Sequence, residues 1–167
     1  MNTYKLSDKL EKALNNQVTL EYDSAFIYRG MEIFFQDMGA KGTTHFFNQQ
    51  TKEEVEHAED FTQFILDVGG KIDIGGLNKP ATEYKSFLEV FEAALAHEKV
   101  VTESIRGILE IAIEEKNYAA ENFLRKYVDE QVEEEDTFTG LVDQLKWIGD
   151  DVAALLQFDK QLAGRQD

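Results

Sequence analysis

The segment Lys52–Asp60 constrains the fold more than any other part of the chain, because it places Glu54 and His57 three positions apart. Residues three apart lie on one face of a helix. Here that face is apolar, since the same spacing also selects Phe47, Phe61, Ile65 and Val68. A buried carboxylate destabilises a fold unless it is paired or binds a cation. Taken alone, Glu54 could equally turn toward the edge of a helical bundle.

Three further predicted helices carry polar side chains in the middle of their apolar faces: Glu21, Glu98, and the pair Gln131 and Glu134. Glu21 lies 33 positions before Glu54. Glu98 lies the same 33 positions before Gln131. A shift of 77 positions maps Glu21, Glu54 and His57 onto Glu98, Gln131 and Glu134. We interpret this repeat as two helical hairpins that face each other around a dinuclear metal site.

The composition indicates one globular, all-α domain spanning residues 1–167. The chain has 43% hydrophobic and 30% charged residues, a single proline and no strand-like alternation. A net charge of −16 argues against nucleic acid and anionic membrane partners and favours cations, although a solvated acidic surface would explain it equally well. The absence of cysteine excludes disulfides, thiolate zinc sites and iron–sulfur clusters. It fits a cytoplasmic protein, and we expect neither a signal peptide nor a membrane span.

Breaks in the helical pattern predict helices over about 7–37, 43–68, 83–115, 118–148 and 150–162. Ser7 is the expected N-cap of the first helix, and Gly39 with Gly42 is expected to form the first turn. The second helix should be about 40 Å long. The connection at about 71–82 can span a similar distance. The third helix can therefore start parallel to the second, in a crossover topology.

The segments Leu20–Tyr22, Glu53–His57, His97–Glu98 and Asp129–Glu135 resemble those of the non-haem ferritins of bacteria and archaea. The resemblance covers nearly the whole chain. It implies a ferritin-like four-helix bundle with a long crossover and a short fifth C-terminal helix. It also implies an iron storage protein with ferroxidase activity, which oxidises Fe(II) with O2 or H2O2 at a dinuclear centre. The ferric oxy-hydroxide product would be deposited inside a shell of 24 identical subunits.

Carried over by position, the resemblance places Glu21, Glu54 and His57 at a first iron position. Glu54 would bridge both irons, and Glu98 would be the main ligand of the second. The remaining site residues that the resemblance implies are Gln131, Glu134 and Tyr28. Gln131 is either a neutral ligand or a hydrogen-bond partner of Glu98. Tyr28 is either a redox-active group or an ordinary core tyrosine.

The resemblance also implies a third iron position formed by Glu53, Glu130 and Glu133 together with Glu134. A site made only of oxygen ligands should favour Fe(III) over Fe(II). The alternative is that these carboxylates form a solvated acidic face.

The chain departs from the family pattern at two positions. Lys126 stands where several bacterial members place Trp, directly before Tyr127, so electron supply from an aromatic pair is in doubt. Val55 stands where haem-binding relatives place Met, so no haem is expected. The sequence gives no metal role to the other histidines and nearby carboxylates: His45, His97, Glu56, Glu59 and Glu135.

Three rival functions are weighed against ferroxidase activity. A shell subunit without a working centre should lack Glu54 or His57, and both are present. A peroxide reductase of the rubrerythrin kind usually carries a Cys-rich iron module, which is absent. A DNA-protecting mini-ferritin would hold its metal ligands between subunits, without the 77-residue repeat.

Overall fold

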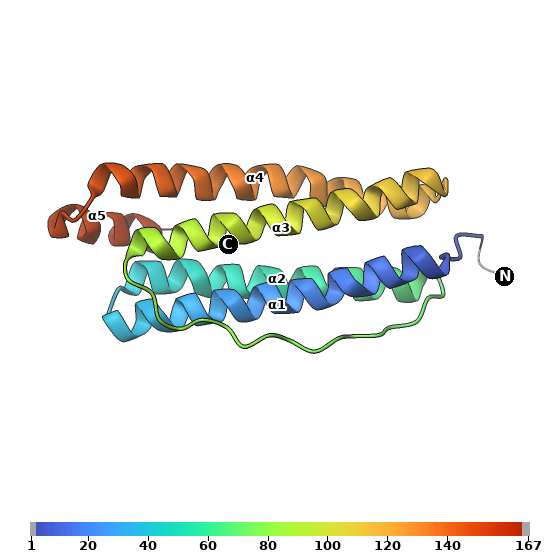
Figure 1. Cartoon of the computed structure of the whole chain (residues 1–167), viewed down its shortest axis with the longest axis horizontal. Coiled ribbons are helices and arrows are strands. Elements are labelled where there is room, and N and C mark those ends of the chain that lie inside the picture. Colours follow the sequence, from blue (N-terminus) through green and yellow to red (C-terminus); the bar gives the residue numbers. More distant parts are fainter. Residues whose placement is uncertain (1–2, 165–167) are drawn as a thin grey trace.

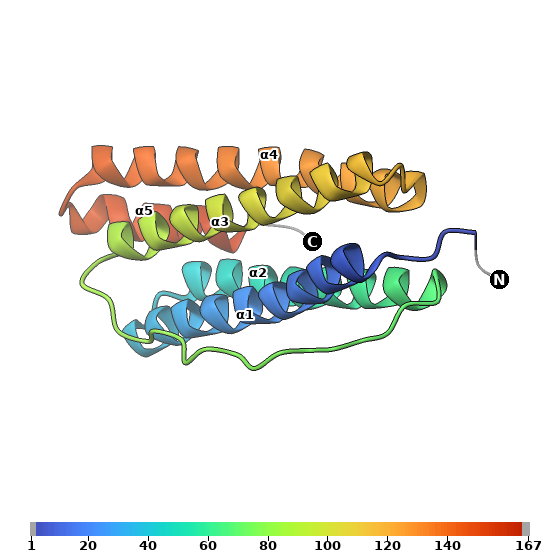
Figure 2. The ribbon, with the colours of Figure 1, turned by 45° about the vertical axis from the view of Figure 1, so that its right-hand side comes forward.

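The computed structural model describes residues 3–164, which form five helices and no strand (Figure 1). The helices are α1 (Asp8–Met38), α2 (Lys41–Asp67), α3 (Phe87–Glu114), α4 (Tyr118–Ile148) and α5 (Val152–Ala163). The hairpin α1–α2 packs against the hairpin α3–α4, and α5 folds back along the end of the bundle beside α2 (Figure 2). The predicted four-helix bundle with a short fifth helix is confirmed. No helix in this described range is long and apolar enough to cross a membrane.

Local capping residues set most helix ends. Ser7 caps α1, where its side chain accepts a hydrogen bond from the backbone N–H of Leu10 at 3.0 Å. Ser86 caps α3 in the same way, so this helix starts at Phe87 rather than near residue 83. Gly39 ends α1 with a positive φ of 82°, a conformation that favours glycine.

Gly42 lies inside α2 and not in the preceding turn, which corrects the sequence-based expectation. A Cβ atom at Gly42 would lie 1.7 Å from the backbone oxygen of Asp159, so α5 reaches α2 only because this position has no side chain. The Asp159 carboxylate then accepts hydrogen bonds from the backbone N–H groups of Gly42 (3.2 Å) and Thr43 (2.7 Å). It therefore caps α2 from a distant part of the chain.

The connection between α2 and α3 runs along the outside of α1 (Figure 1). Four α1 side chains, each one helical turn from the next, accept hydrogen bonds from backbone N–H groups of the connection at 2.7–3.1 Å: Glu11, Asn15, Thr19 and Asp23. These bonds hold the connection along α1 as it returns to the far end of the bundle, so α3 starts parallel to α2. They also satisfy the backbone of a segment that has no secondary structure of its own.

The apolar core has two halves. One half centres on Leu14, Ile65 and Leu124, and the other on Phe35, Phe91 and Phe138. Four buried polar side chains lie on the same helix faces between these halves: Glu21, Glu54, Glu98 and Gln131. Every helix of the bundle therefore contributes one polar group to a single level of the core.

The contact at Gly42 predicts a specific sensitivity of α5. We expect Gly42→Ala to lower the free energy of unfolding by about 1–3 kcal/mol, because the new methyl group must displace α5. The matched control is Gly107→Ala in α3, where a Cβ meets nothing within 4 Å. This control should leave stability unchanged or raise it by about 0.5–1 kcal/mol. Equal denaturation midpoints for the two variants would contradict the close approach.

Candidate metal centre

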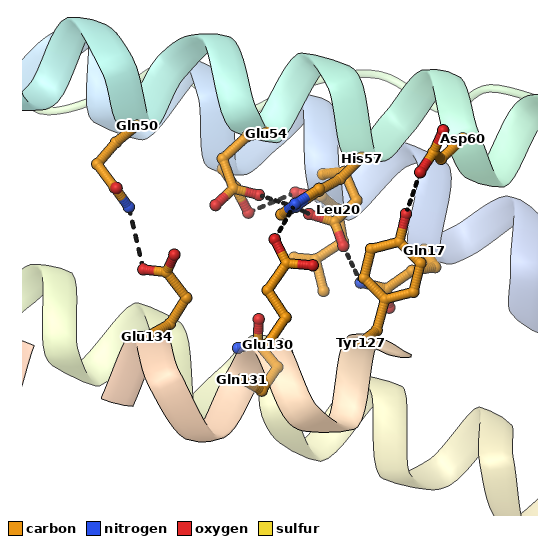
Figure 3. A network of polar contacts seen from close by, with 12 residues as sticks. Gln17, Leu20, Gln50, Glu54, His57, Asp60, Tyr127, Glu130, Gln131 and Glu134 are labelled. Atoms are coloured by element: carbon orange, nitrogen blue, oxygen red, sulfur yellow. Dashed lines mark hydrogen bonds and ion pairs between the residues drawn. The ribbon is translucent and has the colours of Figure 1, made fainter. Parts of the chain in front are cut away.

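The polar level of the core brings together side chains from all four long helices. Glu21 and Glu98 are each 1% exposed, Glu54 is 3% exposed and Gln131 is 4% exposed. His57, one turn after Glu54, is the half-buried member of the set. Figure 3 shows Glu54 and His57 of α2 directed toward α4, where Glu130 and Gln131 lie.

Glu21, Glu54 and His57 form a group able to hold a metal ion. Nδ1 of His57 lies 3.3 Å from Oε2 of Glu54 and 3.8 Å from Oε2 of Glu21. One candidate ligand atom from each residue lies within 4.8 Å of the others. Oε2 of Glu21 is buried and has no donor at hydrogen-bond distance, since Nδ1 of His57 approaches it only to 3.8 Å, so it is available to a cation. Two carboxylates and an imidazole are a donor set that suits iron.

The electrostatics of this group favour exchange of protons for a cation. Burial raises the pKa of Glu54 well above its usual value, and the negative charge of Glu21 raises it further. Burial alone would also raise the pKa of Glu21, but the interactions with His57, Glu54 and Gln17 together outweigh it and lower that pKa. Burial alone would lower the pKa of His57, yet its hydrogen bond to Glu130 and the nearby carboxylates of Glu21 and Glu54 raise that pKa. The carboxylates around His57 therefore favour its protonated, positively charged form.

Glu98 and Gln131 form the opposite half of the centre. The side-chain amide of Gln131 donates hydrogen bonds to Oε2 of Glu98 at 3.0 Å and to its backbone oxygen at 3.2 Å. The Tyr28 hydroxyl donates to the other oxygen of Glu98. Burial raises the pKa of Glu98, and burial together with the charge of Glu98 raises the pKa of Tyr28. The charge of Glu98 also contributes to the raised pKa of Glu54, so the two halves interact.

The carboxylates predicted for a third position line one open groove. Glu53 of α2 shares a groove of about 550 Å³ with Glu130, Glu133 and Glu134 of α4. Within it, Oε1 of Glu130 lies 2.6 Å from Nε2 of His57. Glu134 accepts a hydrogen bond from the Gln50 side chain at 3.2 Å (Figure 3). The structure thus joins Glu130 to the first half of the centre and holds Glu134 from α2.

Two supporting glutamines were missed at the sequence level. Gln17 donates to Oε1 of Glu21 at 2.7 Å, and Gln50 donates to Glu134; both glutamines are fully or almost fully buried. A signal was present, because each glutamine lies four positions before a core carboxylate, Glu21 or Glu54, on the same apolar face. A buried polar residue one turn before a ligand is a candidate to orient that ligand.

The residue directly before Tyr127 is a lysine rather than an aromatic residue. Lys126 lies over the Tyr127 ring, with Nζ 4.9 Å from the ring centroid, and pairs with Asp60 at 2.8 Å. The Tyr127 hydroxyl donates to the same Asp60 oxygen at 2.9 Å.

His97 lies 2.7 Å from the Ser24 hydroxyl, so its imidazole has a partner outside the group of carboxylates.

Comparison with known proteins agrees with this architecture. The profile of the ferritin-like domain family matches residues 11–148. The chain is 41% identical over 160 residues to a bacterial non-heme ferritin of Staphylococcus haemolyticus, with 96% of each chain covered. It is 37% identical over 157 residues to a probable bacterial non-heme ferritin-like protein of Haemophilus influenzae, covering 94% of this chain and 95% of the relative.

Among solved structures, an open-pore ferritin from the hyperthermophilic archaeon Archaeoglobus fulgidus superimposes with a TM-score of 0.96 at 38% identity. The superposition covers 98% of this chain and 100% of the archaeal chain. The match therefore extends along nearly the whole chain. By fold and by sequence, the chain belongs to the ferritin family.

Proposed function

We propose that this chain is an iron-storing ferroxidase, which oxidises Fe(II) with O2 or H2O2 at a dinuclear centre. The observation that carries the proposal is the buried group of Glu21, Glu54 and His57, in which Oε2 of Glu21 has no hydrogen-bond donor. Burial of a carboxylate oxygen that has no donor destabilises the fold. Its presence in an apolar core therefore indicates that it binds a cation. Membership in the ferritin family supports iron as the cation.

In this proposal the substrate Fe(II) ions occupy two positions. Glu21, Glu54 and His57 hold the first ion, and Glu98 with Gln131 holds the second. Glu54 would bridge the two positions, as the resemblance to the ferritins implies. Carboxylates stabilise the ferric state, which makes each ion a better one-electron donor. Each of the two ions gives one electron to the same oxidant molecule, so that O2 is reduced to H2O2, or H2O2 to water. The Fe(III) then hydrolyses to oxy-hydroxide and releases protons.

The acidic groove supplies a third position in the same proposal. Glu53, Glu130 and Glu133 offer oxygen ligands only, which suit Fe(III). Glu134 also lines the groove. Because Glu130 also contacts His57, an ion leaving the first position meets this residue next. The groove would therefore conduct the oxidised product away from the centre.

The shell belongs to the proposal because α5 and the end of α4 expose apolar side chains. Trp147 is 93% exposed, Val152 is 69% exposed and Leu156 is 61% exposed. Exposed apolar residues that cluster at one end of a molecule favour burial against other subunits. The proposal therefore includes the shell of 24 identical subunits around the mineral that the resemblance to the ferritins implies.

The first prediction concerns the bridge. Glu54→Ala should abolish rapid Fe(II) oxidation, because it removes the one carboxylate shared by both positions. The measurement is the initial rate of ferric absorbance after Fe(II) is mixed with air-equilibrated protein. The control is Glu56→Ala on the same helix, since this side chain is exposed. A wild-type initial rate in Glu54→Ala would refute the dinuclear assignment.

Proton release gives the same variant a second readout. The raised pKa values of Glu54 and His57 favour the protonated forms of both side chains in the metal-free centre. A cation displaces these protons, so anaerobic Fe(II) binding should release protons and weaken as the pH falls. Glu54→Ala should release fewer protons per ion bound, whereas Glu56→Ala should match the wild type.

The second prediction concerns the acidic groove. Glu133→Ala should leave the first oxidation of two ions fast, because Glu133 is exposed and lies outside the central group. Later turnovers should slow as the oxidised product leaves less readily. Crystals soaked with Fe(II) and then exposed to air should show metal beside Glu130 and Glu133. If metal occupies Glu54 and Glu98 but never this groove, its carboxylates are only a solvated face.

The third prediction concerns assembly. Sedimentation velocity should show one large closed species, consistent with 24 subunits. Val152→Glu, which places a charge on the exposed apolar side of α5, should reduce that species in favour of smaller ones. A wild-type protein that remains a monomer or dimer across the micromolar range would exclude the shell.

A further inference from the structure

A second groove lies between α3 and α4 and ends at the candidate metal centre. It has a volume of about 540 Å³, and its inner end is formed by Gln131 and Thr102. Gln131 is 4% exposed and donates its amide to Glu98 at 3.0 Å. A single layer of side chains therefore separates the groove from Glu98.

The walls of this groove are largely apolar. Ile105 of α3 and Val128 and Val132 of α4 contribute aliphatic side chains to it. Lys99 and Arg106 also line it, and the aliphatic stems of such side chains can cover apolar surface. A small apolar molecule gains free energy on moving from water to such a surface.

The charges of the two grooves differ. Around the α3–α4 groove, Lys99 and Arg106 balance Glu103 and Glu135, and Arg106 pairs with Glu103 at 2.7 Å. The groove at Glu53 and Glu130 holds five carboxylates against the single cation of Lys126. A cation is drawn toward the acidic groove, whereas a neutral molecule experiences no such preference.

Thr102 and Gln131 close the inner end of the α3–α4 groove by hydrogen bonds. The Thr102 hydroxyl lies 2.7 Å from Oε1 of Glu135 and 3.2 Å from the Gln131 amide nitrogen. Both side chains are uncharged, and both can rotate about their side-chain bonds. A small neutral molecule can pass them without separating any ion pair, because the Glu103–Arg106 pair lies on the exposed surface.

We propose that the α3–α4 groove is the route by which dioxygen reaches Glu98, separate from the acidic groove that attracts cations. The inference rests on the proposed ferroxidase function, which makes O2 a substrate of this centre. Val132 and Val128 define the groove on the α4 side, so a larger side chain there should obstruct the route. The centre itself should keep its affinity for Fe(II), because neither valine belongs to its group of ligands.

The test compares Val132→Trp with Val100→Trp. Both valines are exposed, at 68% and 56%, but only Val132 lines the groove. With Fe(II) saturating, Val132→Trp should raise the KM for O2 about threefold or more, with kcat little changed at high O2. Val100→Trp should behave like the wild type. Anaerobic Fe(II) binding and sedimentation should be the same for all three proteins.

A second measurement needs no variant and no turnover. Wild-type crystals under xenon pressure should show xenon between Ile105, Val128 and Gln131, because apolar cavities bind this gas. The proposal is overturned if the groove holds no xenon, or if the two tryptophan variants have the same KM for O2. A wild-type protein that binds Fe(II) but does not oxidise it rapidly in air refutes the ferroxidase function instead. The xenon result then still decides whether the groove admits an apolar gas.

Discussion

The burial of three carboxylates in one level of a helical bundle is the constraint on which the rest of the structure depends. Glu21, Glu54 and Glu98 are nearly inaccessible, and no lysine or arginine is among the buried polar residues of the described chain. Their charge is therefore compensated by protons, by hydrogen-bond donors and by His57. An arrangement compensated in this way exchanges protons readily for a metal cation, which a permanent ion pair would prevent.

The architecture follows from holding these groups together. The buried polar groups come from both hairpins, so neither α1–α2 nor α3–α4 contains all the ligands of the proposed centre. The crossover along α1 brings α3 to the correct end of the bundle, and Glu11 and Asn15 hold it there through backbone hydrogen bonds. The two apolar halves of the core flank the polar level and exclude water from it. This exclusion strengthens the electrostatic interactions within the polar level.

In the proposed function, access to the centre is divided between the two sides of α4. Successive turns of this helix present acidic side chains such as Glu130 and Glu133 to one groove and Val128 and Val132 to the other. Gln131, between them in sequence, faces the centre. One helix with three differently composed faces can thus separate a charged substrate, a neutral oxidant and the metal ligands.

The sequence by itself determined the helices and the faces that each of them buries. Helical periodicity is local, so the stripe around Glu54 and His57 and the 33-residue and 77-residue spacings predicted a polar level in an all-α core. Ser7 was recognisable as a cap for the same reason, because its partner lies three residues away. The 77-residue repeat indicated which helices face one another, although the repeat is not visible in any single segment.

The tertiary structure alone decided the partners that come from distant parts of the chain. Spacing along a helix states which face a side chain occupies, but not which atom of another helix it meets. The contact of Glu130 with His57, the support of Glu134 by Gln50 and the two grooves beside α4 all depend on how α4 packs against its neighbours. Gly42 lies in a helix for the same reason: Asp159, 117 positions later, replaces the cap that the local sequence lacks.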